Sequence, residues 1–203
     1  LADLGVSSMQ LDNPERGFSY KKEGPLDLRL NPLGGTPASQ RLRELDRWEL
    51  EGMLRENSDE PYAGAIAQTI ASKLKKGQAI DTTTQLADAV AKALAALPQE
   101  ERQEAVKKSC ARVFQALRID VNGEFEALDA FLQKLPEAMT VGGRIAILTF
   151  HSGEDRMVKK SFKELEKAGI YREAAKEPIR PCAEECARNA RARSAKLRWA
   201  VKA

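Results

Sequence analysis

The residue of the chain best suited to acid–base chemistry is its single histidine, His151, in the segment TFHSGEDR. It follows the apolar run IAIL and precedes a serine and two carboxylates. A histidine in this position either belongs to a reaction centre or simply marks the end of a strand. Acidic residues favour the first turn of a helix, so Ser152, Glu154 and Asp155 are expected to cap the helix that follows.

Metal and disulfide chemistry find little support in the three cysteines, Cys110, Cys182 and Cys186. Cys182 and Cys186 could share one face of a helix, but the only histidine is distant and there is no second cysteine pair. We therefore expect no zinc site and no disulfide framework. A reducing compartment suits the free thiols.

The composition is that of an ordinary globular chain, and its 203 residues suffice for one large or two small domains. The chain is 42% hydrophobic and 31% charged, which argues against disorder. No apolar run approaches the roughly 20 residues that a membrane-spanning helix needs, and no signal-peptide pattern opens the sequence. Because the first residue is Leu1 rather than methionine, we expect the chain to be a portion of a longer protein.

Positive charge is concentrated in the second half of the chain. The net charge is +3 overall, but it is −2 over residues 1–20, −2 over 21–104 and +7 over 105–203. The segment RNARARSAKLRWAVK contains six basic residues and no acidic one. An anionic partner would be steered to this half, although a solvated basic tail has the same charge pattern. The alternation around Trp199 predicts a strand with a basic face.

Hydrophobic spacing predicts the elements that would position these residues. The opening LADLGVSS indicates a short strand that ends in a Gly/Ser loop, and a turn-rich connector with four glycines and four prolines follows it. From Ala38 the spacing is helical, and a Thr82-x-x-Gln85 capping box begins one helix. Residues 38–97 are therefore predicted to form three helices in a compact module.

After Pro98 the pattern changes to alternating helices and strands. We expect helices at about 100–117 and from about Phe125 to Leu135, a buried strand at 144–150, a further helix, and a last strand KLRWAVK. This order is typical of an α/β sheet, so the helical module looks inserted into an α/β domain. Three strands make an incomplete sheet, and the chain has no G-x-G turn for a nucleotide-like cofactor.

Four separated blocks of the sequence resemble one known family. They read DLGVSSMQLDNPERGFSYKKEGPLDLRLNP, FQALRIDVN, GGRIAILTFHSGEDRMVK and NARARSAKLR, in the order and spacing of that family. Over nearly all of its length the chain is similar to the S-adenosylmethionine-dependent methyltransferases that modify the N4 amino group of a cytosine in bacterial small-subunit (16S) ribosomal RNA. Four ordered blocks are more specific than one short motif.

The resemblance implies a partial Rossmann-like class I methyltransferase domain with an inserted all-helical domain. We assign residues 1–20 and 105–203 to the α/β methyltransferase part. Residues 21–104 are assigned to the connector and to the inserted helical domain that would recognise the substrate. In the family, the glycine loop and the ribose-binding acid precede the DLGVSS segment. The chain thus resembles the family without its N-terminal cofactor half, which accounts for the missing G-x-G.

The resemblance also implies a reaction centre, with Asp3, Ser7, Ser8 and His151 as candidate catalytic residues. Asp3 and Gln10 match positions that contact S-adenosylmethionine, and Asp3 lies at a strand end, where ligands bind in open α/β sheets. The serine hydroxyls and Asp3 could accept the protons of the target amino group. Each residue has a local alternative, because Asp3 and the serines could cap the loop and Gln10 could close it on itself.

RNA contact is predicted for eight basic residues, because arginine and lysine side chains neutralise phosphates. They are Arg16, Lys21, Lys22, Arg29, Arg112, Arg118, Arg191 and Arg193. Phe18 and Tyr20 could stack on an unpaired base, or they could pack the connector instead.

Three departures from the family pattern bear on these expectations. Gly153 stands where the family usually has leucine, which would loosen the loop after His151. The helix YAGAIAQTIASKL is nearly bare of the basic residues usual there. The segment KKSCAR replaces a block of the His-Pro-Ala-Thr-Arg type.

Two functions are consistent with these observations. The first is an rRNA (cytosine-N4) methyltransferase that uses S-adenosylmethionine and acts on small-subunit ribosomal RNA or on the assembled small subunit. The second is a non-catalytic RNA- or ribosome-binding relic of that family. Neither involves a metal or a membrane, and both suit the cytoplasm, with an organellar location and a homodimer left open. We expect the 203-residue chain alone to bind the cofactor weakly or not at all.

Overall fold

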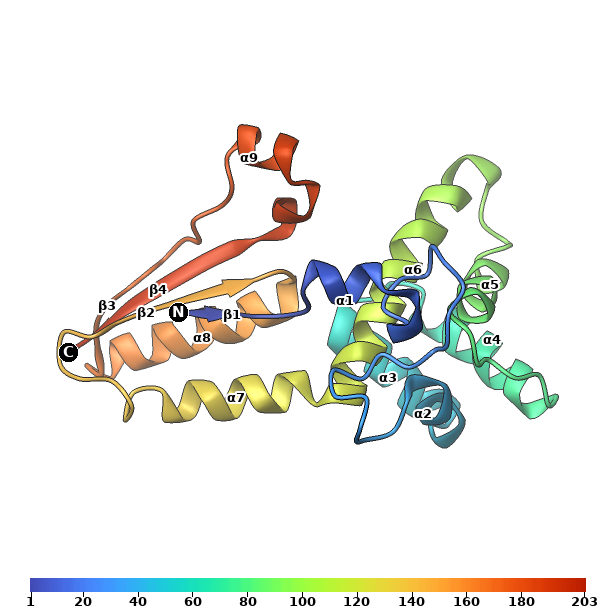
Figure 1. The fold of residues 1–203 in the computed structure, drawn as a ribbon, viewed down its shortest axis with the longest axis horizontal. Helices are drawn as coiled ribbons and strands as arrows, with labels where there is room; N and C mark the ends of the chain where they lie inside the picture. The colour runs from blue at the N-terminus through green and yellow to red at the C-terminus, as the bar shows by residue number, and fades with distance from the viewer. The chain divides into compact units, whose positions relative to one another are not determined.

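The computed structural model describes residues 1–203, which form two compact units that are described separately (Figure 1). One unit comprises Leu1–Gly5 and Phe125–Ala203 and contains the only sheet. The other unit, Val6–Glu124, is helical. The protein is therefore mixed α/β, with all of its strands in the sheet unit and helices in both units.

The sheet unit has four strands in the order β1-β2-β4-β3. The strands are β1 (Ala2–Asp3), β2 (Arg144–Thr149), β3 (Tyr171–Ala174) and β4 (Lys196–Lys202). Strand β1 pairs in parallel with β2, whereas β4 lies antiparallel to both β2 and β3. The parallel pair is the part of the sheet that brings two carboxyl ends of strands to one edge.

Two helices cover the core of this sheet unit, α7 (Glu124–Lys134) and α8 (Ser152–Lys167), and they run beside the strands in Figure 1. Leu128 and Leu132 of α7, Val158 and Phe162 of α8, and Ile147 of β2 are buried together. Between β3 and β4 the chain forms the short helices α9 (Ala183–Arg188) and η2 (Ala190–Ser194). The i, i+4 spacing of the buried residues explains why both helices form on this face.

The helical unit contains seven helical elements of its own. They are α1 (Ser8–Asp12), η1 (Pro14–Arg16), α2 (Ala38–Glu44), α3 (Arg47–Ser58), α4 (Ala63–Lys75), α5 (Thr83–Ala93) and α6 (Gln99–Asn122), with the connector between η1 and α2. Its core includes Leu42, Leu54, Ile66, Val90 and Leu117, all essentially inaccessible to solvent.

The prediction of three helices between residues 38 and 97 was wrong, because there are four. Asp46 ends the first helical run: its side chain accepts hydrogen bonds from the backbone of Trp48 and Glu49, and Glu49 reciprocates in a capping box. Leu42 and Leu50 consequently belong to separate helices, α2 and α3. The strand β3 was also missed, since YREA is short and half of it is charged.

The boundaries predicted at residues 20/21 and 104/105 also differ from the breaks between the compact units. The connector packs on the helices, because Phe18, Leu26 and Leu28 are buried in the helical core. The second predicted boundary falls inside α6, which is one continuous helix of 24 residues. The two compact units therefore separate after Gly5 and after Glu124.

Candidate functional site

The carboxyl ends of β1 and β2 form one edge of the sheet unit. Asp3 pairs in register with Leu148, and the backbone N–H of Leu4 donates to the Leu148 carbonyl at 3.1 Å. The loop after β1 lies against the residue after β2, since a Cβ added to Gly5 would be 3.7 Å from Cδ2 of Phe150. Asp3, at the end of β1, and His151, just after β2, therefore follow two paired strands at the same edge of the sheet.

Asp3 is exposed at this edge, and its carboxylate makes no hydrogen bond or ion pair within the chain. It does not cap the following loop, which was its local alternative. The cap of α1 comes from Ser7 instead. An unpartnered carboxylate at the end of a parallel strand fits a ligand that presents N–H or O–H donors, such as an amine or a ribose hydroxyl.

His151 is the N-cap of α8, which corrects the expectation that Ser152, Glu154 or Asp155 would cap this helix. Its Nδ1 accepts from the backbone N–H of Glu154 at 3.4 Å, so the neutral ring carries its proton on Nε2. That Nε2 lies 3.3 Å from Oε1 of Glu154 without hydrogen-bond alignment. Oε2 of Glu154 accepts from the N–H of Phe150 at 2.9 Å. The imidazole is therefore held by its own helix.

Gly153 is closely packed against Phe125 and His151, and whether it loosens the loop stays a prediction. Gly153 is buried in the first turn of α8, and an added Cβ would lie 2.6 Å from Cζ of Phe125 and 3.2 Å from Nδ1 of His151. The Phe125 ring centre is 5.9 Å from that of His151. The aromatic side chain of α7 thus occupies the space that a side chain at position 153 would need.

Asp155 joins α8 to β4 rather than capping the helix. Its Oδ1 accepts from Nε of Arg198 at 2.7 Å, and Lys196 Nζ approaches Oδ2 at 3.2 Å. Arg198 is only 2% exposed and also donates to the carbonyls of Ala175 and Lys176. Burial acts to raise the pKa of Asp155, but the hydrogen bonds and charges of Arg198 and Lys196 outweigh it and lower the pKa. The predicted basic face of β4 is therefore partly internal.

Ser7, Ser8 and Gln10 belong to the helical unit, where two of them form a capping box. Ser7 Oγ accepts from the N–H of Gln10 at 3.3 Å, and Gln10 Oε1 accepts from the N–H of Ser7 at 2.9 Å. Gln10 thus closes the loop on itself, as its local alternative proposed. Its amide N–H groups and the Ser7 hydroxyl proton are not used in this cap. Ser8 is exposed in the first turn of α1.

Three of the arginines predicted to bind RNA are engaged within the helical unit. Arg16 donates to the carbonyls of Arg29 and Leu30, and its guanidinium lies 5.5 Å from the Phe18 ring centre. Arg29 forms a two-point ion pair with Asp27. Arg118 forms another with Glu124, at 2.7 and 2.9 Å, in which both side chains are 14% exposed.

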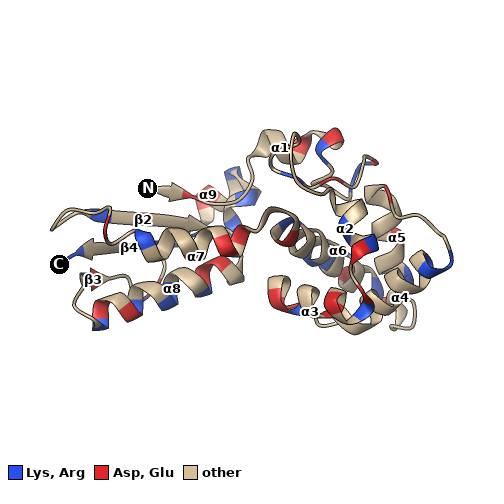
Figure 2. Ribbon diagram, turned by 90° about the horizontal axis from the view of Figure 1, so that it is seen from below, with Lys and Arg blue, Asp and Glu red and all other residues tan.

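The other predicted RNA-binding residues are more accessible. Lys21, Lys22 and both arginines of η2, Arg191 and Arg193, are exposed, and Arg112 is half-buried. Figure 2 shows the basic residues around α9 and η2 in blue. The aromatic residues of the connector pack inward instead. Phe18 is buried, and Tyr20 lies against Phe114 and donates to the Lys107 carbonyl at 3.4 Å. Burial raises the pKa of Tyr20, with a smaller contribution from Cys110.

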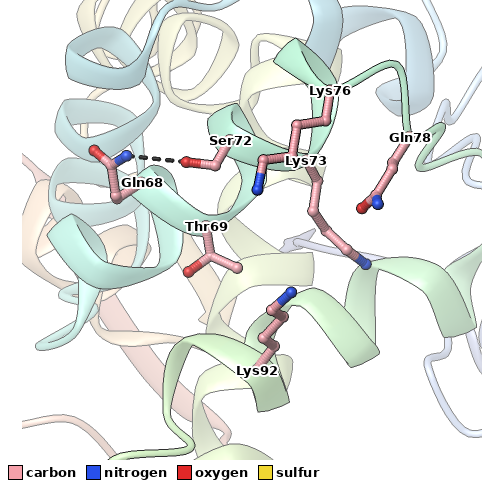
Figure 3. A pocket seen from close by; sticks show the side chains of 7 residues that line it. All are labelled: Gln68, Thr69, Ser72, Lys73, Lys76, Gln78 and Lys92. Carbon is pink, nitrogen blue, oxygen red and sulfur yellow. Dashed lines mark hydrogen bonds between the residues drawn. The ribbon is translucent and has the colours of Figure 1, made fainter.

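Sequence reasoning passed over a polar pocket in the helical unit, because α4 had been considered poor in basic residues. The pocket has a volume of about 190 Å³. The residues that line it all have polar or charged side chains (Figure 3); they are Gln68, Thr69, Ser72, Lys73, Lys76, Gln78 and Lys92. The signal in the sequence was the spacing of polar residues at 69, 72, 73 and 76, which places them on one face of a helix.

The remaining reactive side chains, the cysteines and carboxylates, do not form a cluster that could bind a metal ion. The three cysteines are free, and burial raises the pKa of the Cys110 thiol to about 11. Histidine, cysteine and carboxylate side chains do not gather in groups of three. None of the helices is both long and apolar enough to span a bilayer.

A sheet whose parallel strands end in an exposed carboxylate and a histidine, packed against two helices, defines an α/β protein with its candidate site at the strand ends. The chain belongs to the MraW methylase family, whose sequence profile matches residues 1–203.

Several curated relatives are similar to the whole chain. "Ribosomal RNA small subunit methyltransferase H 1" of Lachnoclostridium phytofermentans is 62% identical over 203 residues, which are 100% of this chain and 56% of the relative. "Ribosomal RNA small subunit methyltransferase H 2" of Alkaliphilus metalliredigens is also 62% identical and is covered to 58%. "Ribosomal RNA small subunit methyltransferase H" of Prochlorococcus marinus is 42% identical over 200 residues, which are 98% of this chain and 64% of the relative. The chain thus spans little more than half the length of the Lachnoclostridium and Alkaliphilus relatives.

Proposed function

We propose that this chain is part of an enzyme that transfers a methyl group from S-adenosylmethionine to the N4 amino group of a cytosine in small-subunit ribosomal RNA. The observation that supports this most directly is the unpartnered Asp3 carboxylate at the β1–β2 edge. Membership of the methylase family and the printed names of the relatives agree with it. The substrate would be the RNA itself or the assembled small subunit, in the cytoplasm.

Asp3 and the neighbouring backbone would orient the target amine. The lone pair of an exocyclic amine is delocalised into the base, so the amine must be held in line with the methyl donor and its protons directed to acceptors. S-adenosylmethionine would supply the methyl-sulfonium when bound. Asp3 offers two acceptor oxygens, and the proton of the product can leave after the transfer, so no separate general base is needed. His151, held as the cap of α8, would border the same edge.

The exposed cations would hold the RNA. Lys21 and Lys22 of the connector, and Arg191 and Arg193 of η2, have exposed side chains that would contact phosphates. Arg16, Arg29 and Arg118 would act indirectly, because their guanidinium groups already brace the connector and the end of α6.

A chimera with the Lachnoclostridium relative tests the proposal. Its 203 matched residues would be replaced by this chain, and methyl transfer to purified small subunits would be measured with labelled S-adenosylmethionine. We expect activity in the chimera and a loss of about 100-fold or more in Asp3→Asn, because an acceptor at the reacting centre is removed. RNA affinity should be unchanged, since Asp3 pairs with no phosphate.

Glu126→Gln is the matched control, because Glu126 is another exposed, unpartnered carboxylate of the sheet unit. Equal activity of the Asp3 and Glu126 variants would exclude Asp3 from the reaction. A chimera that binds small subunits but never transfers a methyl group would instead favour the non-catalytic relic.

A further inference from the structure

The pocket between α4 and α5 gathers three lysines. Lys73 is in the last turn of α4 and Lys76 is its C-cap, while Lys92 comes from the last turn of α5. In Figure 3 these side chains extend around the same space. No aspartate or glutamate lines the pocket, and none of the three ammonium groups forms an ion pair in the structure. The pocket therefore has a positive potential that its own residues leave uncompensated.

Directional donors lie beside these charges. Ser72 Oγ accepts from Nε2 of Gln68 at 3.0 Å, so the hydroxyl proton of Ser72 is free to be donated. Thr69 differs, because its hydroxyl donates to the Ala65 carbonyl at 2.9 Å. The side-chain amide of Gln78 adds a further donor from the loop after α4. Several cations with one hydroxyl and one amide donor form a set that suits an oxyanion.

The size and lining of the pocket suit a phosphate group. The volume of about 190 Å³ is far above the roughly 10–15 Å³ that one water needs, so an oxyanion has room. The lining contains no aromatic side chain, and a nucleobase would find nothing on which to stack. The pocket could recognise the phosphate of a polynucleotide without its base.

We propose that the pocket formed by Lys73, Lys76 and Lys92 binds a backbone phosphate of the RNA substrate. The assignment to RNA rests on the proposed function, whereas the affinity for phosphate does not. It gives the helical unit a part in holding the substrate, although α4 has fewer basic residues than the family pattern predicts.

The competing explanation is purely structural. Lys73 and Lys92 each lie in the last turn of their helix, where a positive charge stabilises the negative end of the helix dipole. Such a role would affect thermal stability and would leave anion binding unchanged. The two explanations therefore predict different measurements.

The first measurement is RNA affinity as a function of KCl concentration, for a small-subunit RNA hairpin and the 203-residue chain. The double variant Lys73→Gln/Lys92→Gln is compared with Lys75→Gln/Lys107→Gln, which removes two exposed lysines outside the pocket. We expect the log–log salt slope of the pocket variant to fall by about 0.7–0.9, the contribution of one phosphate contact, and that of the control to fall by less than half as much. Equal slopes in the two variants, or a loss of thermal stability alone, would overturn the proposal.

The second measurement uses inorganic tripolyphosphate and amide chemical shifts. We expect shifts at Ser72, Gln78 and Lys92 in the unmodified chain and in the control, but not in the pocket variant. Absence of these shifts would refute the phosphate site whatever the RNA result. If tripolyphosphate binds here and the chain has no affinity for RNA, the assignment to RNA fails and the pocket is a site for a small phosphorylated ligand. The proposed function is tested separately, by methyl transfer in the chimera.

Discussion

Gly153 and Phe125 share one space in the sheet unit, so the size of one side chain limits the size of the other. A Cβ at position 153 would lie 2.6 Å from Cζ of Phe125, a separation at which one of the two must move. Overpacking of this kind costs about 1–3 kcal/mol. Alanine is favoured over glycine within a helix by about 1 kcal/mol. The two effects have opposite signs, so the residue at position 125 decides whether alanine at position 153 raises or lowers the stability.

We therefore predict that the effect of Gly153→Ala on stability changes sign with the residue at position 125. With Phe125 present, the free energy of unfolding should fall by up to about 2 kcal/mol. In a Phe125→Ala background the same change should raise it by about 0.5–1 kcal/mol. Urea unfolding of the four proteins in this double-mutant cycle measures the coupling, and a coupling near zero would contradict the packing described above.

The Asp155–Arg198 pair makes stability depend on pH at the acidic end. Arg198 is buried, so Asp155→Asn should lower the free energy of unfolding by about 3–5 kcal/mol at neutral pH, because it leaves a guanidinium without its counter-charge. The pKa of Asp155 is lowered in the folded state, so its contribution is present above the ordinary carboxyl pKa of about 4 and is lost as the pH falls below it.

The difference between Asp155→Asn and the unmodified chain should accordingly shrink as the pH is reduced from about 5 toward 2. Glu164→Gln, an exposed position on the same helix, should show no such difference at any pH. A constant deficit across the pH range would mean that the carboxylate charge of Asp155 is not what stabilises the fold.

These residue-scale contacts show what could be predicted from sequence. Pairs three or four positions apart follow local rules, and the predicted Thr82-x-x-Gln85 capping box is confirmed. Asp155 resembled a helix cap because acidic residues in a first turn usually favour that position. Its actual partner, Arg198, lies 43 residues away, and the strand alternation placed Arg198 on a solvent face. The distance in sequence is the reason that this pair was missed.

At the scale of elements, Asn122 fastens the connector to the end of α6. Its Oδ1 accepts from the N–H of Leu30 at 2.7 Å, and its Nδ2 donates to the Leu28 carbonyl at 2.8 Å. Arg41 of α2 adds an ion pair to Asp120, also at 2.7 Å. Two of the sequence blocks that resemble the family, DLRLNP and FQALRIDVN, are therefore physically joined to each other.

We predict that Asn122→Ala loosens the connector. The Leu28 carbonyl, which belongs to a buried residue, loses its partner at a cost of about 1–3 kcal/mol, whereas the exposed Leu30 N–H can turn to water. Asn122→Asp keeps the acceptor for Leu30 but sets an oxygen against the Leu28 and Arg118 carbonyls, so it should also be destabilising. Hydrogen exchange at the Leu30 amide should quicken in the alanine variant and stay slow in the aspartate variant. Equal exchange in the two would argue against this contact.

Elements themselves were predictable where their pattern was long. The helix α7 and the strand β2 were expected close to their observed bounds, since each has a continuous run of regularly spaced apolar residues. Helices were also expected where α6 and α8 lie, but α6 continues to Asn122 instead of ending near residue 117. The break between α2 and α3 depends on one N-cap, Asp46, inside an otherwise uninterrupted helical pattern. Strand β3 has only four residues, and its pairing with β4 is a long-range contact that no local pattern indicates.

At the scale of the whole molecule, the excess of positive charge in residues 105–203 predicts which residues make RNA binding depend on salt concentration. Arg191→Ala/Arg193→Ala should lower the log–log salt slope of RNA binding by about 1.5, because each phosphate contact contributes roughly 0.7–0.9. Both side chains are exposed in η2, so stability should change little. If the double variant altered only the melting temperature, the basic tail would have a structural role, and the connector lysines would have to hold the RNA.

The chain by itself should bind S-adenosylmethionine poorly. It has no glycine-rich turn, Asp3 is the only side chain at the β1–β2 edge with an unused carboxylate, and Gln10 is partly committed to its capping box. Isothermal calorimetry should give no micromolar affinity for the 203-residue chain and a clear signal for the chimera. Micromolar binding by the chain alone would show that other residues replace the glycine turn.

The shared space of positions 125 and 153 also limits the order in which this part of the protein can diverge. A lineage that enlarges position 153 while Phe125 is kept passes through an overcrowded intermediate, and one that shrinks position 125 while Gly153 is kept passes through an intermediate with a void. Each single change is therefore costly, and the two positions are expected to change together. Among related chains, a large residue at position 153 should be found together with a small one at position 125.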